Sequence, residues 1–171
     1  MFLINFSNKL SLNQVPKNII MSVGRMTPFV AKNIEYMKSK NTNWTLHLFR
    51  DADIEPFIRK HYNSEVLTLY NRINPLYGAS RADFFRYLAL YALGGVYLDS
   101  KSSCDRTLDE AVLTNGVVDI ILWNNGHRFP NILCDCSPHP QDEFCQWVLI
   151  APQYSPLMQQ VIDDVSFNLK Y

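Results

Sequence analysis

Hydrophobic and polar positions follow two periods along this chain, one typical of helices and one typical of strands. The apolar run 18–23 predicts a short buried strand that ends at Gly24. From Pro28 onward, apolar residues recur at helical spacing as far as the polar segment 38–43, which predicts a helix followed by a turn. The alternating segment 44–49 predicts a second strand. A rhythm of strand and helix therefore begins near the amino end.

The middle of the chain is predicted to be mostly helical. Asp51 and Asp53 can cap a helix, because carboxylates at an amino end satisfy free amide donors and favour the helix dipole. Segment 64–72 predicts another short helix. The best-defined helix spans 80–93, with a continuous apolar stripe and with Ser80 as its expected cap.

The segment after this helix is a short strand between glycines and an acid. Gly94 and Gly95 predict a left-handed end of the helix, and 96–98 is an apolar run that opens at Asp99 onto polar residues. The remaining predicted elements are a strand at 117–123, a polar loop at 131–144, a strand at 146–151 and a helix at 156–169. Strands that alternate with helices predict an α/β fold with a mainly parallel sheet covered on both faces.

Size and charge exclude several classes of protein. A chain of 171 residues favours one domain, 1–171, and 16 basic against 16 acidic residues give no net attraction to nucleic acid or anionic lipid. No apolar run reaches the roughly 18 residues of a membrane-spanning helix. Because secretory features are absent as well, we expect a cytoplasmic protein with free thiols.

The cysteines leave one alternative open. A set of three cysteines and one histidine could bind zinc, although its spacing differs from that of paired zinc knuckles; a plain loop with half-buried cysteines is the other interpretation. The set is Cys134, Cys136, His139 and Cys145.

Asp99 is the first candidate for chemistry, because open α/β sheets bind ligands beyond the carboxyl ends of their strands. In the preceding helix, Asp83 and Arg86 are three residues apart and share a face. Carboxylates accept from paired sugar hydroxyls, and a guanidinium can donate to hydroxyl or phosphate oxygens. The alternative is structural: Asp83 and Arg86 form an internal ion pair, or Arg81 takes Asp83.

A family resemblance adds to this interpretation. The segment 80–87, SRADFFRY, followed by 94–99, GGVYLD, resembles the signature of glycosyltransferase family 32, the group described by a DXD sugar-binding region. It is also similar in pattern to the glucosyltransferase domain of large clostridial toxins. The similarity extends to 15–20, 44–51 and 146–157, so it covers most of the chain.

The resemblance implies a GT-A fold and a transferase that takes a sugar from a nucleotide sugar, usually a uridine diphosphate derivative. The acceptor would be a glycan or glycoprotein, the anomeric configuration would be retained, and a Mn²⁺ or Mg²⁺ ion would bridge the diphosphate to acidic residues. Hard oxygen ligands suit either ion.

The resemblance also implies roles for single residues. Asp83 would accept from ribose or sugar hydroxyls, and Arg86 would hold the sugar. Asp99 would be the first acid of the motif and the metal ligand, and with Arg86 it would carry catalysis. The other residues expected to bind the donor are Ser22 and Val23, by their backbone at the base, and Tyr97, Lys101 and Gln146.

Lys101 departs from the family pattern, because it stands where a second acid is expected and a charged lysine cannot ligate a metal. One hypothesis is that Asp99 holds a metal with help from Asp105 or from the diphosphate alone. Another is that Lys101 lies against the diphosphate and supplies positive charge itself. In a third, Lys101 points into solvent and the metal site is merely weakened.

Further candidates and functions stay open. Polar residues after strand 117–123 could reach the acceptor or form a plain turn, and two acids could contribute polar contacts from a loop; these residues are Asn124, Asn125, His127, Asp142 and Glu143. The chain is a minimal domain, a fragment of a longer protein, or a copy that has lost part of its machinery. Beside an active transferase, we consider a nucleotide-sugar-binding domain without turnover and a zinc-stabilised interaction module.

Overall fold

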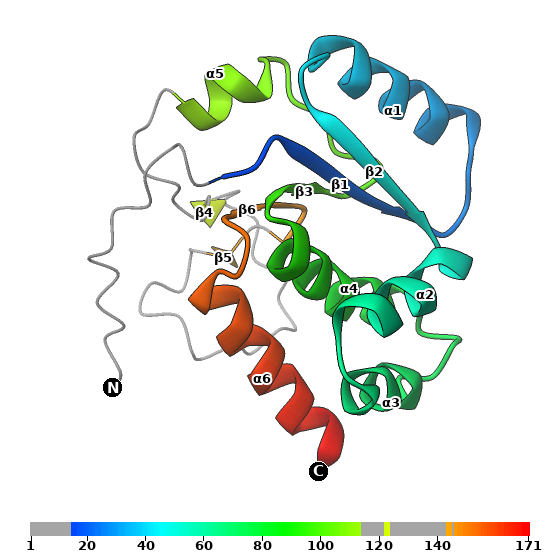
Figure 1. The fold of residues 1–171 in the computed structure, drawn as a ribbon. Coiled ribbons are helices and arrows are strands. Elements are labelled where there is room, and N and C mark those ends of the chain that lie inside the picture. Colours follow the sequence, from blue (N-terminus) through cyan, green and yellow to red (C-terminus); the bar gives the residue numbers. More distant parts are fainter. Residues whose placement is uncertain (1–14, 114–121, 124–142, 145) are drawn as a thin grey trace.

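A four-stranded sheet forms the centre of the protein in this computed structural model (Figure 1). The described residues are 15–113, 122–123, 143–144 and 146–171. The strands, in their order across the sheet, are β2 (Thr45–Arg50), β1 (Asn18–Val23), β3 (Gly95–Leu98) and β6 (Val148–Ala151). β1 pairs in parallel with β2 and with β3, and β6 runs antiparallel to β3. The prediction of a mainly parallel α/β sheet is confirmed, with one antiparallel strand at its edge.

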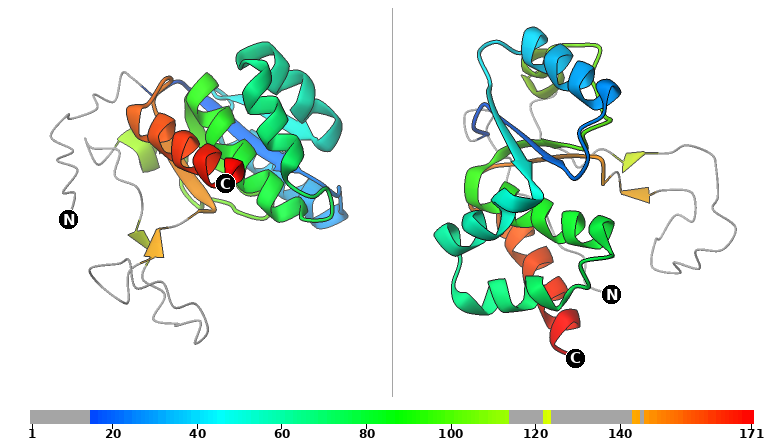
Figure 2. Two further views of the ribbon diagram at one scale, coloured as in Figure 1. Left: turned by 90° about the horizontal axis from the view of Figure 1, so that it is seen from below. Right: turned by 90° about the vertical axis from the view of Figure 1, so that its right-hand side faces the viewer.

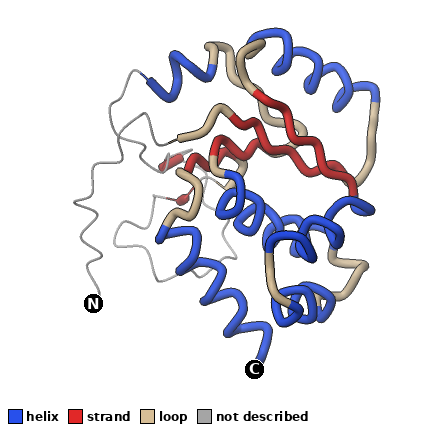
Figure 3. The backbone as a smooth tube through the Cα atoms, in the orientation of Figure 1, coloured by secondary structure: helices blue, strands red, loops and turns tan. Residues whose placement is uncertain are grey.

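Helices cover both faces of this sheet, as Figures 1, 2 and 3 show. On one face lie α1 (Pro28–Lys40) and α5 (Leu108–Leu113), and on the other lie α2 (Asp51–His61), α3 (Ser64–Arg72), α4 (Gly78–Leu93) and α6 (Pro156–Lys170). Successive strand residues point to opposite faces. Ile19 and Met21 therefore join the core under α1, whereas Ile20 and Tyr97 join the core under α4.

Capping side chains explain where several helices begin. Thr27 Oγ1 accepts from the Val30 amide at the start of α1, and the Asp53 carboxylate accepts from the Arg50 amide at the start of α2, at 2.8 Å. The cap expected at Ser80 is wrong. α4 already begins at Gly78, and its flanking residue makes no side-chain cap, so Ser80 lies inside the first turn as an exposed residue.

Gly94 and Gly95 join α4 to β3 in a way that other residues cannot. Both have positive φ, +63° and +118°, as the predicted helix end requires. A Cβ on Gly94 would lie 2.4 Å from the backbone nitrogen of Gln153, and a Cβ on Gly95 would lie 2.4 Å from the carbonyl oxygen of Asn18. These glycines therefore let the chain turn back tightly against β1.

The carboxyl-terminal third differs from the prediction at two element boundaries. Glu143, expected in a loop, belongs to β5 (Glu143–Phe144), which pairs antiparallel with β4 (Leu122–Trp123). β4 contains the described end of the strand expected at 117–123. β6 begins at Val148, two residues later than predicted. Within the described ranges, no helix is long and apolar enough to cross a membrane.

Candidate functional site

The geometry of α4 and β3 brings Arg86 and Asp99 to the same edge of the sheet. Arg86 precedes Gly94 by eight residues, and Asp99 follows Gly95 by four. Eight residues of helix span about 12 Å, and four residues of strand span about 13 Å. Since the chain reverses at the two glycines, the two side chains return to one level, at the carboxyl ends of the parallel strands β1 and β3.

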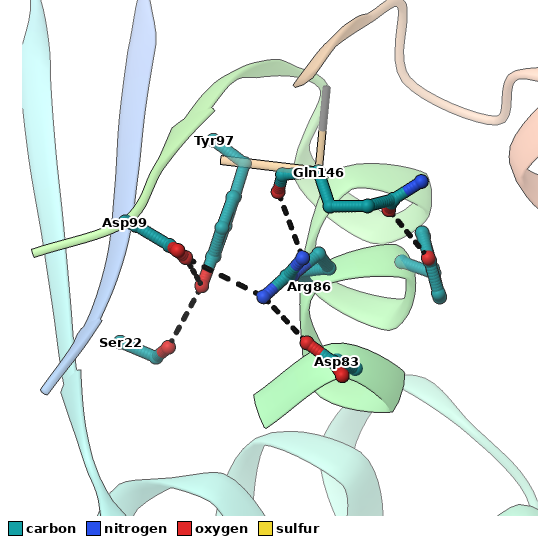
Figure 4. Close-up of polar contacts among 7 residues, drawn as sticks. Ser22, Asp83, Arg86, Tyr97, Asp99 and Gln146 are labelled. Carbon is teal, nitrogen blue, oxygen red and sulfur yellow. Dashed lines mark hydrogen bonds and ion pairs between the residues drawn. The ribbon is translucent and has the colours of Figure 1, made fainter. Parts of the chain in front are cut away.

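Arg86 is the centre of the polar cluster at this edge (Figure 4). Its side chain is 6% exposed, and its Nη2 lies 2.6 Å from Asp83 Oδ1 and 3.4 Å from Asp99 Oδ1. Its Nη1 donates to the carbonyl oxygen of Gln146 at 2.8 Å, and its guanidinium lies 5.2 Å from the ring centroid of Tyr97. These contacts fix one cation between two carboxylates.

Tyr97 connects this cluster to β1. Its phenol donates to Asp99 Oδ1 at 3.1 Å and lies 3.0 Å from Ser22 Oγ. Since the one phenolic proton goes to Asp99, the Ser22 hydroxyl donates to Tyr97. Burial raises the pKa of Tyr97 to about 12, so the phenol is a neutral donor at ordinary pH.

The pKa of Asp99 is subject to opposing effects. Burial raises the pKa of its carboxyl group, while the charge of Arg86 and the hydrogen bond from Tyr97 lower it, and the net shift is upward. Its backbone amide donates to the carbonyl oxygen of Trp147 at 2.9 Å. The acid is therefore held by both backbone and side chain, and one third of its side chain, 33%, remains exposed.

Gln146 joins the cluster from the segment that leads into β6. Its carbonyl oxygen binds Arg86, and its side-chain Oε1 accepts from the Tyr87 hydroxyl at 2.7 Å. Tyr87 was not singled out from the sequence. Its position next to Arg86 gave no signal, because its partner lies 59 residues away along the chain.

Lys101 sits on a tight turn rather than in the cluster. The Ser102 amide donates to the carbonyl oxygen of Asp99 at 2.8 Å, which closes the turn. The buried Asn33 of α1 donates to the carbonyl oxygens of Ser100 and Ser102, at 3.0 and 2.8 Å. Lys101 is exposed at this anchored turn, and the structure gives it no hydrogen bond or ion pair to the described residues.

The donor set does not match a metal site with two acids. Asp99 is the acid of the segment Asp99-Ser100-Lys101, and its Oδ1 is already bound by Arg86 and Tyr97. The carbonyl oxygen of Asp105 accepts from Lys40 at 2.7 Å, and among the described residues its carboxylate does not join Asp99 in a metal-binding group. In the part of the chain that the structure describes, no three His, Cys, Asp or Glu side chains gather to hold a metal. An ion here would need diphosphate oxygens and water as its other ligands.

Most residues predicted to bind a donor are brought together. The cluster unites Ser22, Asp83, Arg86, Tyr97, Asp99 and Gln146. The Val23 side chain instead packs in the core under α1, so only its backbone could take part, as expected. The structural alternative is also observed, because Asp83 and Arg86 do form an ion pair; Arg81 lies over the ring of Tyr70 at 4.4 Å.

Several predicted residues lie outside the described ranges. They are the acceptor candidates Asn124, Asn125 and His127, the candidate loop contact Asp142, and the zinc candidates Cys134, Cys136, His139 and Cys145. These predictions therefore stay predictions. Glu143 falls in β5, where only its backbone is described.

Comparison with protein families gives a match over most of the chain. A family model described as glycosyltransferase sugar-binding region containing DXD motif matches residues 8–117. This span includes α4, β3 and the turn that carries Lys101.

Two curated proteins are similar in sequence. The initiation-specific alpha-1,6-mannosyltransferase of Candida albicans is 25% identical over 152 residues, which cover 81% of this chain and 38% of that protein. Inositol phosphoceramide mannosyltransferase 3 of Schizosaccharomyces pombe is 42% identical over 62 residues, 36% of this chain and 17% of that protein. The chain thus spans well under half the length of these relatives.

A solved structure shares the fold. PaToxG glycosyltransferase superposes with a TM-score of 0.60 at 15% identity, over 91% of this chain and 62% of that one. At this identity the likeness concerns the fold alone, and it confirms the GT-A-like architecture expected from the sequence.

Proposed function

The chain belongs to the family of glycosyltransferases whose sugar-binding region contains a DXD motif, and we propose that it transfers a sugar from a nucleoside diphosphate donor to a glycan or glycoprotein. One observation carries the proposal. A buried arginine lies between two partly exposed carboxylates at the sheet edge where α/β folds bind ligands, and all three come from the segment that the family model matches.

Asp83 is the group best placed to contact the sugar in this proposal. Its side chain is 53% exposed, and its Oδ1 is fixed by Arg86, so a second carboxylate oxygen is free to accept from donor hydroxyls. Arg86 acts as a positioning residue, because its two terminal nitrogens are engaged by Asp83, Asp99 and Gln146. Preorganised charges of this kind avoid the cost of reorganisation during the reaction.

The diphosphate leaves with added negative charge, which the Asp99 carboxylate cannot offset because it is an anion itself. The described residues lack the second acid of a DXD metal site, so the expected Mn²⁺ or Mg²⁺ stays a prediction. We assign to Lys101 the positive charge that would offset the charge of the diphosphate. Lys101 lies on the turn directly after Asp99, which Asn33 anchors, and its ammonium group has no partner among the described residues. A cation near the leaving group stabilises the charge that develops there.

The relatives favour mannose as the first sugar to test. Both curated proteins are named mannosyltransferases, and such enzymes typically use GDP-mannose, whereas the family resemblance points to a uridine diphosphate sugar. Retention of the anomeric configuration is the stereochemical outcome that we propose.

Release of nucleoside diphosphate from a panel of donors tests the proposal. GDP-mannose and several UDP-sugars are incubated with the chain and with mannotriose, and the product configuration is read by NMR. We expect release from at least one donor and its loss in Asp83→Asn, with Glu55→Gln as the control. Glu55 is also an exposed acid in an ion pair with an arginine, but it lies on α2.

The outcomes separate two functions. Release and transfer support an active enzyme. Saturable donor binding without release supports the alternative of a nucleotide-sugar-binding domain, which Lys101 in place of the second acid favours. If no donor binds, both are wrong.

A further inference from the structure

A groove of about 510 Å³ adjoins the candidate donor site on the outer side of α4. Its walls are the loop between α3 and α4, the amino-terminal half of α4, and the carboxyl end of α6. Figure 1 shows that the ends of α3 and α6 converge in this region. The volume falls within the range of about 300–1,000 Å³ typical of small-molecule sites.

Two residues belong both to the groove and to the polar cluster. Asp83 lines the groove and binds Arg86, and Tyr87 lines the groove and binds Gln146. A molecule in the groove would therefore touch the group that we assign to the donor sugar. For a transfer reaction, an acceptor hydroxyl must come within about 3–3.5 Å of the reacting carbon. Asp83 and Tyr87 are the residues through which the groove borders the candidate donor site.

The side chains of the groove suit a carbohydrate. Tyr77 presents a ring that is 65% exposed, and apolar residues of α6, Val165 and Leu169, lie opposite. Asn74 and Ser80 add an amide and a hydroxyl beside the Asp83 carboxylate. Sugars combine apolar C–H faces, which pack on aromatic rings, with hydroxyls that bind amides and carboxylates. Asn74 Oδ1 accepts from the Leu76 amide and Asp83 Oδ1 pairs with Arg86, so the Asn74 side-chain NH₂ and the Ser80 hydroxyl are the groups that a sugar would meet.

We infer that this groove is the acceptor subsite and that it takes an oligosaccharide. That the bound sugar is an acceptor rests on the proposed function; the location of the subsite rests on Asp83 and Tyr87, which line the groove and contact Arg86 and Gln146. Tyr77 supplies the principal aromatic ring of the groove. Its hydrogen bonds with Asn74 and Arg81 are made by its backbone, and its side chain does not cap α4, so the ring is available to a ligand.

Direct binding of mannotriose to the whole chain, measured by titration calorimetry or NMR, tests the inference without requiring turnover. We expect Tyr77→Ala to weaken mannotriose binding about tenfold, and Tyr77→Phe to stay within about threefold of wild type, because the ring is kept. Tyr154→Ala is the matched control. Tyr154 is 64% exposed and packs on Tyr91, near the opposite end of α4.

The results distinguish this inference from the proposed function. If wild type releases no nucleoside diphosphate but binds mannotriose through Tyr77, the proposed function fails and the groove remains a glycan site. If mannotriose does not bind saturably, or if Tyr77→Ala and Tyr154→Ala behave alike, the inference is overturned. It is equally overturned if Tyr77→Ala abolishes a dimer seen by analytical ultracentrifugation while mannotriose binding is unchanged, because the occupant is then a second copy of the chain.

Discussion

Replacing Arg86 by lysine keeps the charge but removes the planar fork that holds the site. Arg86 binds Gln146 through Nη1 and Asp83 through Nη2 while it lies over Tyr97. A lysine ammonium is a point charge on a flexible stem and cannot meet all of these partners at once. We therefore expect Arg86→Lys to lower stability and donor affinity together.

The magnitude follows from the contacts. A hydrogen bond from a charged group to the part-buried carbonyl of Gln146 is worth about 1.5–3 kcal/mol, and the half-exposed pair with Asp83 is worth less than about 1 kcal/mol. If both contacts are lost, the sum is about 1.5–4 kcal/mol, which for a chain of this size lowers Tm by about 3–16 °C.

Urea and thermal unfolding followed by circular dichroism measure the change, and donor titration measures the affinity. Arg81→Lys is the matched control, because Arg81 lies on the same helix and also stacks on a tyrosine ring, but it forms no ion pair with the described residues. If Arg86→Lys and Arg81→Lys have the same Tm and donor affinity, the reasoning about this cluster is wrong.

Three further substitutions test the turn at Gly94, the charge of Lys101 and the ionisation of His47. Gly94→Ala, with a positive φ and a Cβ contact of 2.4 Å, should destabilise by about 2–5 kcal/mol in urea unfolding, whereas Gly78→Ala, with open space around it, should be neutral or stabilising. Lys101→Asp should make donor binding depend on Mn²⁺, with about a tenfold loss on chelation against less than about threefold in wild type; equal losses would contradict the role of Lys101. Burial lowers the pKa of His47 below 6.5, so the neutral ring is favoured on folding. The neutral His47 ring contributes fully to the free energy of unfolding above pH 6.5, and this contribution is lost as the pH falls through the lower pKa of the folded state. In urea unfolding, His47→Gln should therefore lose less stability on acidification than wild type does. An unchanged pH dependence would refute this.

Local patterns were sufficient to predict the part of the fold that positions the cluster. The apolar stripe of α4, the glycines after it and the short run of β3 together specify a helix that turns back onto a strand. From this turn it follows that Asp99 and Arg86 reach the same edge. The antiparallel direction of β6 was not predicted, because strand periodicity is the same in either direction.

Long-range contacts account for what the sequence did not indicate. The bond between Tyr87 and Gln146 and the anchoring of the Lys101 turn by Asn33 join residues about 60 to 70 positions apart. No local pattern encodes such pairs. The start of α4 at Gly78 was missed for a different reason, since Ser80 is a good cap by type but the helix begins two residues before it.

A crystal structure of the chain with a hydrolysis-resistant nucleoside diphosphate sugar would locate the donor on the protein. We expect the sugar to lie against Asp83, with a hydroxyl about 2.5–3.0 Å from the carboxylate, and the diphosphate to lie at the carboxyl edge of β1 and β3 beside Asp99 and Lys101. A donor bound at saturation elsewhere on the chain, with the contacts of Arg86 unchanged and Asp83 facing solvent, would contradict it.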